Sequence, residues 1–253
     1  MSLGEPRGVV GLPDIHAGAQ RVLSWLTRIS SFFVPSACGG CRRPGELICA
    51  ECRMRAIPID WPMCLRCGRR MAQTVERCWS CRHNATPMDQ VHAAFLYTEP
   101  ISTIIHQMKY KGAFALAAPL VELMLRHPVQ WHNPPELLVP VPLHPVRQRQ
   151  RGYNQSTLLA RELAHHWRIP VDEKALQRIR YTTPQVGLNA IERHANVAGA
   201  FVADPQRVQN KHILLIDDVY TTGATLSAAT LALQEAGTCS VAAFCAARRG
   251  RTG

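Results

Sequence analysis

Long apolar runs are absent from this chain of 253 residues. No uninterrupted apolar stretch reaches the roughly 18 residues that would suggest a membrane-spanning helix. The nearest candidate for an export signal is VLSWLTRISSFF at residues 22–33, but Arg28 interrupts it and a poor cleavage site follows it. These absences argue against stable membrane insertion and against export, so we expect a cytoplasmic protein.

Residues 1–34 are instead predicted to form an N-terminal tail that contains an amphipathic helix. Apolar residues recur there at helical spacing, and we expect this face to pack on the chain's own core. The residues of this face are Val22, Leu26, Ile29 and Phe33.

Acidic residues are scarce relative to basic ones: 18 Asp and Glu stand against 29 Lys and Arg, which gives a formal net charge of +11. An apolar content of 47% with 19% charged residues excludes a disordered chain, and the length allows one or two domains. The basic excess predicts attraction to polyanions, either nucleic acid or phosphorylated small molecules. It is distributed in clusters rather than in one tail: CRRPG, CLRCGRR, HPVRQRQRG, LQRIR and ARRGR.

The sequence also lacks the side-chain patterns of several other functional classes. His144, His165 and His166 do not form a metal-binding constellation, and no residues resemble a nucleophile with its base. No helix-turn-helix is recognisable, which weakens but does not exclude a DNA-binding repressor.

Cysteine, by contrast, is concentrated near the start of the chain. Eight of the ten cysteines fall between residues 38 and 81, always as C-x-x-C pairs. Two such pairs supply the four thiolates of a tetrahedral zinc site, whereas disulfides favour secreted chains and a redox dithiol would be single. We therefore predict a double zinc ribbon over residues 35–88, holding one or two structural zinc ions. The ligands are Cys38, Cys41, Cys49, Cys52, Cys64, Cys67, Cys78 and Cys81.

The pairing of these cysteines is not fixed by their spacing. Sequential use of neighbouring pairs is simplest, but interleaved pairing or the loss of one site is also compatible with the sequence. Arginines beside the turns either contact nucleic acid or form ordinary solvated surface: Arg42, Arg43, Arg66, Arg69 and Arg70.

From residue 89 onward, segments typical of strands alternate with segments typical of helices. Strands are predicted at 90–97, 137–143, 212–218 and 239–247, and helices at 100–112, 113–126, 153–169 and 223–237. This alternation predicts an α/β domain over residues 89–253, with a parallel sheet covered on both faces. Ligands of such folds bind at the carboxyl ends of the strands.

The stretch HILLIDDVYTTGATL, residues 212–226, places Asp217 and Asp218 at such a strand end. A loop of hydroxyl side chains around Gly223 follows and leads directly into a predicted helix. Backbone N–H groups and the dipole of a helix N-terminus favour an anion, while carboxylates suit ribose hydroxyls and magnesium. The stretch therefore predicts a phosphate site with two carboxylates just before it.

ILLIDDVYTTGAT resembles the signature by which type I phosphoribosyltransferases bind phosphoribosyl pyrophosphate (PRPP). The chain from Cys38 to Arg249 is similar to the ComF (ComFC, DNA-utilisation) family, which joins a double zinc ribbon to such a domain. The supporting stretches are the four cysteine pairs, IIHQMKYKG, LLVPVPLHPVRQRQRGYNQS and TTPQVGLNAIERHANVAGAF.

The resemblance implies a role for each part of the site. Asp217 and Asp218 would contact the ribose hydroxyls at the catalytic centre. The 5′-phosphate would be bound by Val219, Tyr220, Thr221, Thr222, Gly223, Ala224 and Thr225. The pyrophosphate or substrate contacts would be Lys109, Pro140, Val141, Pro142, Leu143, Arg147 and Arg151. For Lys109, Arg147 and Arg151 a solvated surface role is the alternative. Gln185, Arg193 and Asn196 would face the site from a flap, or would pin that loop by hydrogen bonds.

The resemblance also implies PRPP with Mg²⁺ as ligand and displacement of pyrophosphate by a nitrogen nucleophile. The family's process is DNA uptake in natural transformation, or the use of external DNA. This implies single-stranded DNA and the uptake or recombination machinery as partners. Three interpretations stay open: a phosphoribosyltransferase with an unidentified acceptor, a DNA-handling protein, and a PRPP-sensing regulator without turnover.

Overall fold

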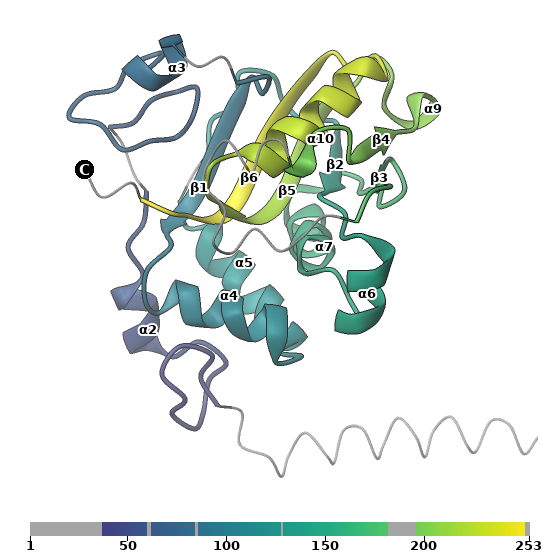
Figure 1. Ribbon diagram of the computed structural model, residues 1–253. Helices are drawn as coiled ribbons and strands as arrows, with labels where there is room; N and C mark the ends of the chain where they lie inside the picture. The colour runs from purple at the N-terminus through teal and green to yellow at the C-terminus, as the bar shows by residue number, and fades with distance from the viewer. Residues whose placement is uncertain (1–36, 60–61, 84–85, 128, 182–195, 251–253) are drawn as a thin grey trace, which may run out of the picture.

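The computed structural model describes residues 37–59, 62–83, 86–127, 129–181 and 196–250 (Figure 1). The predicted N-terminal amphipathic helix and the predicted flap residues Gln185 and Arg193 lie outside these residues. At the centre is a four-stranded parallel sheet with the strand order β1-β6-β5-β2. Its strands are β1 (Gln90–Leu96), β2 (Leu137–Pro140), β5 (His212–Tyr220) and β6 (Ser240–Arg248).

Helices cover both faces of this sheet, as predicted. Side chains alternate between the faces of a strand, so Leu214 and Ile216 join one buried cluster while Ile213 and Leu215 join another. The first cluster packs against α4 (Ile101–Tyr110), α5 (Ala117–Met124) and α7 (Gln155–Trp167). The second packs against α10 (Ala224–Glu235). The continuous apolar run in β5 is therefore the pattern of a strand buried on both sides.

Strand β5 is longer than predicted, and its extra length shapes the site. It continues past the two aspartates because Val219 and Tyr220 pair with the end of β6. On the other side, β2 ends at Pro140, opposite Ile216. The aspartates therefore have a neighbouring strand on one side only, and their other side lies beyond the end of β2.

Several short elements were not predicted. Helix α6 (Pro145–Arg151) follows β2, with His144 as its N-cap and Gly152, in the left-handed region, at its end. A short 3₁₀ helix (Phe114–Leu116) precedes α5. The cysteine-rich region holds α2 (Ala50–Arg55) and α3 (Trp79–His83).

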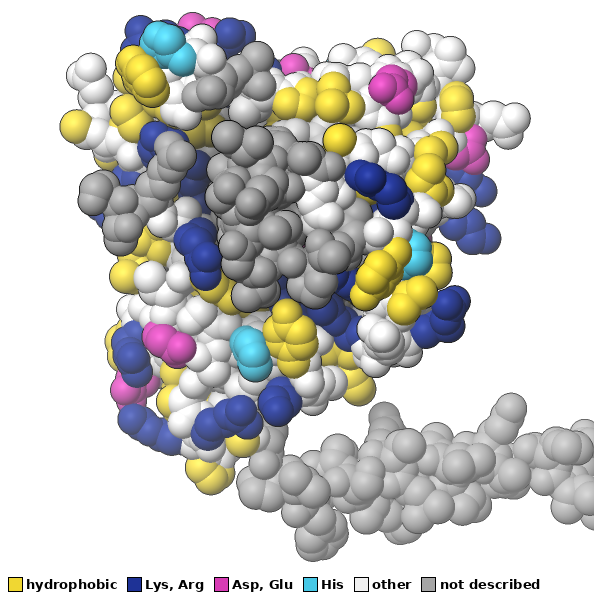
Figure 2. All heavy atoms as spheres, in the orientation of Figure 1, with side chains coloured by type: hydrophobic (Ala, Val, Ile, Leu, Met, Phe, Trp, Pro, Cys, Tyr) yellow, Lys and Arg dark blue, Asp and Glu magenta, His cyan; other side chains and the backbone are white. Residues whose placement is uncertain are grey.

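Basic side chains lie at several separate places on the face shown in Figure 2. They gather in the region of α6. They also gather at the bottom of the molecule, around the first cysteine-rich segment, which contains Cys38 to Cys52. Among the residues that the structure describes, no helix has the length and apolar character needed to cross a membrane.

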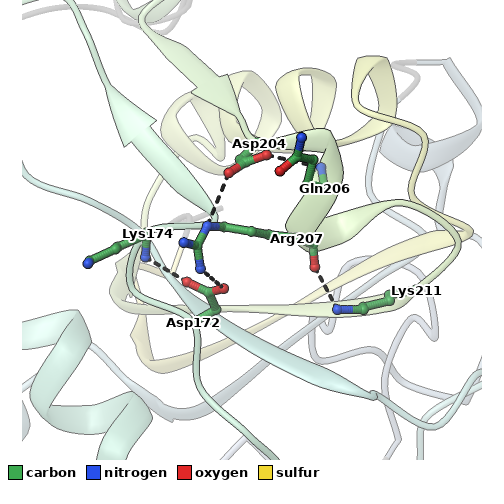
Figure 3. A network of polar contacts seen from close by, with 6 residues as sticks. All are labelled: Asp172, Lys174, Asp204, Gln206, Arg207 and Lys211. Atoms are coloured by element: carbon green, nitrogen blue, oxygen red, sulfur yellow. Dashed lines mark hydrogen bonds and ion pairs between the residues drawn. The ribbon is translucent and has the colours of Figure 1, made fainter.

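A second, antiparallel sheet of β3 (Leu176–Arg178) and β4 (Phe201–Ala203) lies beside α10. A polar network around Arg207, on α9 (Pro205–Val208), fastens it (Figure 3). The Arg207 guanidinium binds Asp172 at 2.8 Å and Asp204 at 3.1 Å, and Lys211 Nζ donates to the Arg207 carbonyl at 2.7 Å. The network ties the end of the small sheet where β3 begins and β4 ends to the segment before β5.

The two cysteine-rich segments pack on different parts of the main domain. In the first, Cys38 and Cys52 join the core cluster beneath α4 and α5, and Gln107 of α4 donates to the Gly39 carbonyl. In the second, Val91 of β1 donates to the Arg66 carbonyl at 2.9 Å, and Arg248 of β6 donates to the Cys67 carbonyl. Both segments therefore pack directly on the main domain.

Candidate functional site

The acid pair lies where β5 runs past the end of β2. Asp218 is buried, with 4% of its surface exposed, and its carboxylate has a partner on each oxygen. Lys109 Nζ of α4 lies 2.7 Å from Oδ1, and Gln155 Nε2 of α7 donates to Oδ2 at 2.6 Å. The half-buried Asp217 accepts from the Ser156 hydroxyl at 3.0 Å. Three elements distant in sequence thus meet at the two carboxylates.

The start of α7 is held in this position by Asn154. Its side-chain oxygen caps the helix by accepting from the Ser156 amide at 3.1 Å. Its side-chain nitrogen donates to the Val141 carbonyl at 2.9 Å, and the Val141 amide donates to the Ile216 carbonyl. One asparagine therefore joins the predicted pyrophosphate loop to the helix that presents Gln155 and Ser156.

The two carboxyl groups differ electrostatically. Burial and the neighbouring Asp218 carboxylate together raise the pKa of Asp217 to about 7. Burial opposes the charge of Lys109, but the Asp218 carboxylate beside it raises the pKa of this lysine above its ordinary value. The Asp218–Lys109 pair is therefore a fixed ion pair, while Asp217 exchanges a proton near neutral pH.

The predicted phosphate loop connects β5 to α10. Gly223 is the N-cap of α10 with φ of +84°, and the Thr222 hydroxyl accepts from the Ala224 amide at 3.4 Å. A Cβ at position 223 would lie 2.8 Å from the Tyr220 hydroxyl, so both the backbone and the space require glycine. The turn places the N-terminal end of α10, which attracts anions, beside the acid pair.

The predicted phosphate-binding residues divide into two groups. Tyr220 and Ala224 are buried, and the Tyr220 ring packs under the Arg248 guanidinium at 4.8 Å. Thr221, Thr222 and Thr225 remain partly exposed. The buried residues support the loop, and the threonine hydroxyls are the groups within reach of a ligand.

The fold places the predicted pyrophosphate contacts in different surroundings, and only some of them lie beside the acid pair. Pro140 ends β2 and Val141 is buried, whereas Pro142 and Leu143 are half-exposed. Lys109 is already paired with Asp218, as described above.

The predicted arginine contacts stand on α6. Arg151 donates to the side-chain oxygen of Gln155, so it reaches the acid pair through that residue. Arg147 lies over the Tyr181 ring at 5.7 Å.

Asn154, Gln155 and Ser156 were not predicted as site residues. Their signal in the sequence is a run of polar side chains at the start of an amphipathic helix, directly after an N-cap residue. That signal also fits an ordinary helix start, and only the fold shows that the first turn faces Asp217 and Asp218.

The eight predicted metal ligands form two groups of four, pairing neighbouring C-x-x-C motifs. Within each group the ligand atoms all lie within 4.8 Å of one another. The Sγ atoms of Cys41 and Cys49 are 3.7 Å apart, and those of Cys67 and Cys78 are 3.9 Å apart. Four thiolates at about 2.3 Å from zinc would be separated by about 3.8 Å at the corners of a tetrahedron. Both clusters therefore fit a closed zinc site and use the sequential pairing.

The chain is similar to known proteins along most of its length. A family model described as a phosphoribosyl transferase domain matches residues 152–253. The DNA utilization protein YhgH of Salmonella typhimurium is 33% identical over 224 residues, covering 85% of this chain and 98% of that protein.

Two competence proteins match as well. Competence protein F of Haemophilus influenzae is 30% identical over 197 residues, covering 75% of this chain and 85% of that protein. Competence protein ComFC of Bacillus subtilis is 28% identical over 206 residues, covering 77% of this chain and 81% of that protein. The similarity to each of these three relatives covers much more of this chain than residues 152–253, which the domain model matches.

Proposed function

Because the chain belongs to the ComF family of competence and DNA-utilisation proteins, we propose that it binds PRPP at the acid pair and the loop opening α10. The observation that carries the proposal is the geometry of β5. Two carboxylates stand beyond the end of β2, and a glycine-capped helix N-terminus follows within a few residues. The carboxylates suit the ribose hydroxyls, and the threonine loop with α10 suits the 5′-phosphate.

Each part of the site then has a place in pyrophosphate displacement. The bond from ribose C1 to the pyrophosphate oxygen breaks while a bond from C1 to an acceptor nitrogen forms. Positive charge that develops on the sugar is stabilised by the nearby carboxylates of Asp217 and Asp218. Arg147 and Arg151, on the helix that follows the loop at 140–143, are basic groups available to the leaving pyrophosphate. Asp217 and Asp218 are the residues that would hold Mg²⁺, and the ion would supply positive charge to neutralise the phosphates.

We further propose that the protein acts in the uptake or use of external DNA and holds single-stranded DNA. The names of its relatives and the net charge of +11 support this role. The uptake or recombination machinery would be its partner. The complete acid pair also favours a second candidate, a transferase that acts on a nucleobase or amine.

Thermal unfolding with and without PRPP and Mg²⁺ tests the central proposal. A ligand at about 100 times its Kd adds about 2.7 kcal/mol to the free energy of unfolding, which raises the melting temperature by about 5–10 °C. The variant carrying Asp217→Ala and Asp218→Ala should lose this rise. Asp204→Ala, in the distant network around Arg207, should keep it. An unchanged melting temperature of the wild type at millimolar PRPP would contradict the proposal.

Pyrophosphate release from PRPP separates binding from catalysis. It should be measured with a panel of nucleobases, amines, nucleotides and oligonucleotides as acceptors. Release with one class identifies the acceptor and supports a transferase. Binding of PRPP without release for any acceptor supports a PRPP-sensing protein.

A further inference from the structure

Two arginines of helix α6 each lie over the ring of an exposed tyrosine from another segment. Arg151 stands over the Tyr110 ring at 5.5 Å, and Arg147 stands over the Tyr181 ring at 5.7 Å. The two arginines are four residues apart, so they lie one above the other on the same face of the helix. Tyr110 ends α4 and is 61% exposed, and Tyr181 follows β3 and is 51% exposed. Three separate segments thus contribute to one row of alternating aromatic and basic groups.

Further aromatic side chains extend this row at both ends. His144 lies edge-on to Tyr181 at 5.1 Å, and His106 lies against Tyr110 at 4.8 Å. Phe114, which is 62% exposed, lies edge-on to Tyr153 at 6.2 Å. Figure 2 shows hydrophobic, histidine and basic side chains next to one another in the region of α6. We call the row formed by His106, Tyr110, Phe114, His144, Arg147, Arg151, Tyr153 and Tyr181 the α6 strip.

The charge of the α6 strip is of one sign. No Asp or Glu occurs at residues 137–161, at residues 100–121 or at residues 174–191, and these segments contain every residue of the strip. Fixed positive charge on segments that themselves contain no acidic residue suits the phosphates of a polyanion. Exposed aromatic rings suit the faces of unpaired bases, which are hidden inside a duplex.

We propose that the α6 strip binds a single strand of nucleic acid, with bases stacked on Tyr110 and Tyr181 and phosphates on the α6 arginines. The proposal rests on the DNA-handling part of the proposed function, but it does not depend on PRPP binding. An arginine over an aromatic ring gives each tyrosine a defined orientation, so a base can stack on the ring at little ordering cost. The combination of stacking rings with a basic track is typical of single-strand sites.

The α6 strip leads directly to the acid pair. Tyr110 follows Lys109, whose ammonium group pairs with Asp218. Arg151 donates to Gln155, which donates to the other oxygen of Asp218. A strand bound on the strip therefore lies beside the site proposed for PRPP.

Fluorescence anisotropy with a labelled thymidine oligonucleotide of about 12 nucleotides tests the assignment on the full chain. Tyr110→Ala and Tyr181→Ala should each raise the Kd by about fivefold to a hundredfold, whereas Tyr110→Phe should change it little. Trp79→Ala is the matched control, because Trp79 is 68% exposed but lies on α3, in the second cysteine-rich segment. An abasic oligonucleotide of equal length should bind wild type and Tyr110→Ala equally well, since it has no bases to stack.

Two outcomes would overturn the assignment. In one, both tyrosine variants bind the oligonucleotide like the wild type while Trp79→Ala does not, which would place the strand on the cysteine-rich segment. In the other, the wild type binds a duplex and a single strand equally well.

The PRPP-dependent rise in melting temperature, measured on the same variants, keeps the two proposals separate. Tyr181→Ala with weakened strand binding and an unchanged rise supports both proposals. In another outcome the tyrosine variants lose strand binding, and PRPP does not raise the melting temperature even of the wild type. This outcome supports strand binding by the α6 strip and contradicts PRPP binding at the acid pair.

Discussion

Asp218 is an enclosed carboxylate whose charge depends on two residues from different helices. Lys109 supplies the opposite charge and Gln155 supplies a hydrogen bond, so both oxygens have partners. A buried charge without a partner costs several kcal/mol, whereas a paired one is tolerated. Lys109 is therefore a positioning residue for the acid pair, in addition to any contact that it makes with a ligand.

Replacing Lys109 should accordingly destabilise the protein through Asp218. Lys109→Met is expected to lower the free energy of unfolding by about 3 kcal/mol, because it leaves a buried carboxylate unpaired. Lys111→Met, at an exposed lysine two residues away, is the control and should change stability little. Urea unfolding of these variants measures the effect. Adding Asp218→Asn to Lys109→Met should restore part of the loss, and a further loss would contradict this account.

Asp217 should give the stability of the free protein a characteristic pH dependence. Its pKa is about 7 in the folded chain, compared with about 3.9 in an unfolded one. Between these values the folded state binds more protons, so the wild type loses stability as the pH rises from about 4 to about 7. Asp217→Asn lacks this loss and can still accept from the Ser156 hydroxyl.

The free energies of unfolding of the wild type and Asp217→Asn should therefore differ least near pH 4 and most above pH 7. The variant should have the higher free energy of unfolding there. The difference should be only about 1–2 kcal/mol, because water partly screens the charge of the half-exposed Asp217. Thermal unfolding from pH 4 to pH 8 measures the difference. If the stabilities of the two proteins change with pH in parallel, the pKa of Asp217 is not raised and this account is wrong.

At the scale of elements, the site depends on how the β5–α10 turn is built. Gly223 has a positive φ, and its missing side chain leaves room for the Tyr220 hydroxyl. The Tyr220 ring is fixed in turn by Arg248 of β6. The turn is therefore set by packing between β5 and β6 as well as by its own sequence.

Gly223→Ala should weaken both stability and PRPP binding. The added methyl group meets the Tyr220 hydroxyl, and the backbone strain adds about 1 kcal/mol or more. Gly199→Ala is the matched control, because Gly199 also has a positive φ but has no atom within 4 Å of an added Cβ. Both variants should lose stability, but only Gly223→Ala should lose PRPP affinity as well. Equal PRPP affinities would show that the turn tolerates the methyl group.

The sequence predicts the long elements well because their patterns are local. The apolar run of β5, the amphipathic pattern of α7 and the glycine after α10 each determine an element without reference to the rest of the fold. Helix α6 was missed because its sequence, PVRQRQR, has no apolar face. The length of β5 was missed because it depends on pairing with the end of β6.

The partners of the acid pair depend on the tertiary fold in the same way. Gln155 and Asp218 are 63 residues apart, and no local pattern connects them. Their contact arises because Asn154 fixes the start of α7 beside the end of β2. Adjacent aspartates before a threonine loop predict a site, but no local pattern predicts the residues that hold them in place.

At the scale of the whole molecule, two four-cysteine clusters pack on different parts of one α/β domain. The first shares the core beneath α4 and α5, and the second contacts β1 and β6. Arg248 joins the second cluster to the proposed phosphate loop, since it donates to the Cys67 carbonyl and covers the Tyr220 ring. The cysteine clusters thus support the site as well as their own loops.

Metal analysis of the purified protein should find two zinc ions per chain. Cys52→Ser and Cys78→Ser should each reduce the content to one, because they disrupt different clusters. Cys239→Ser is the control and should retain two, because this exposed cysteine belongs to neither cluster. Loss of both ions from a single variant would contradict two independent sites.

Calorimetric titration of PRPP with Mg²⁺ into the full-length protein tests the central claim most directly. The account predicts saturable binding of one PRPP per chain, with the heat lost when Asp217→Ala and Asp218→Ala are combined and kept in Asp204→Ala. No binding heat for the wild type at millimolar PRPP, at two temperatures and with zinc fully loaded, would contradict it.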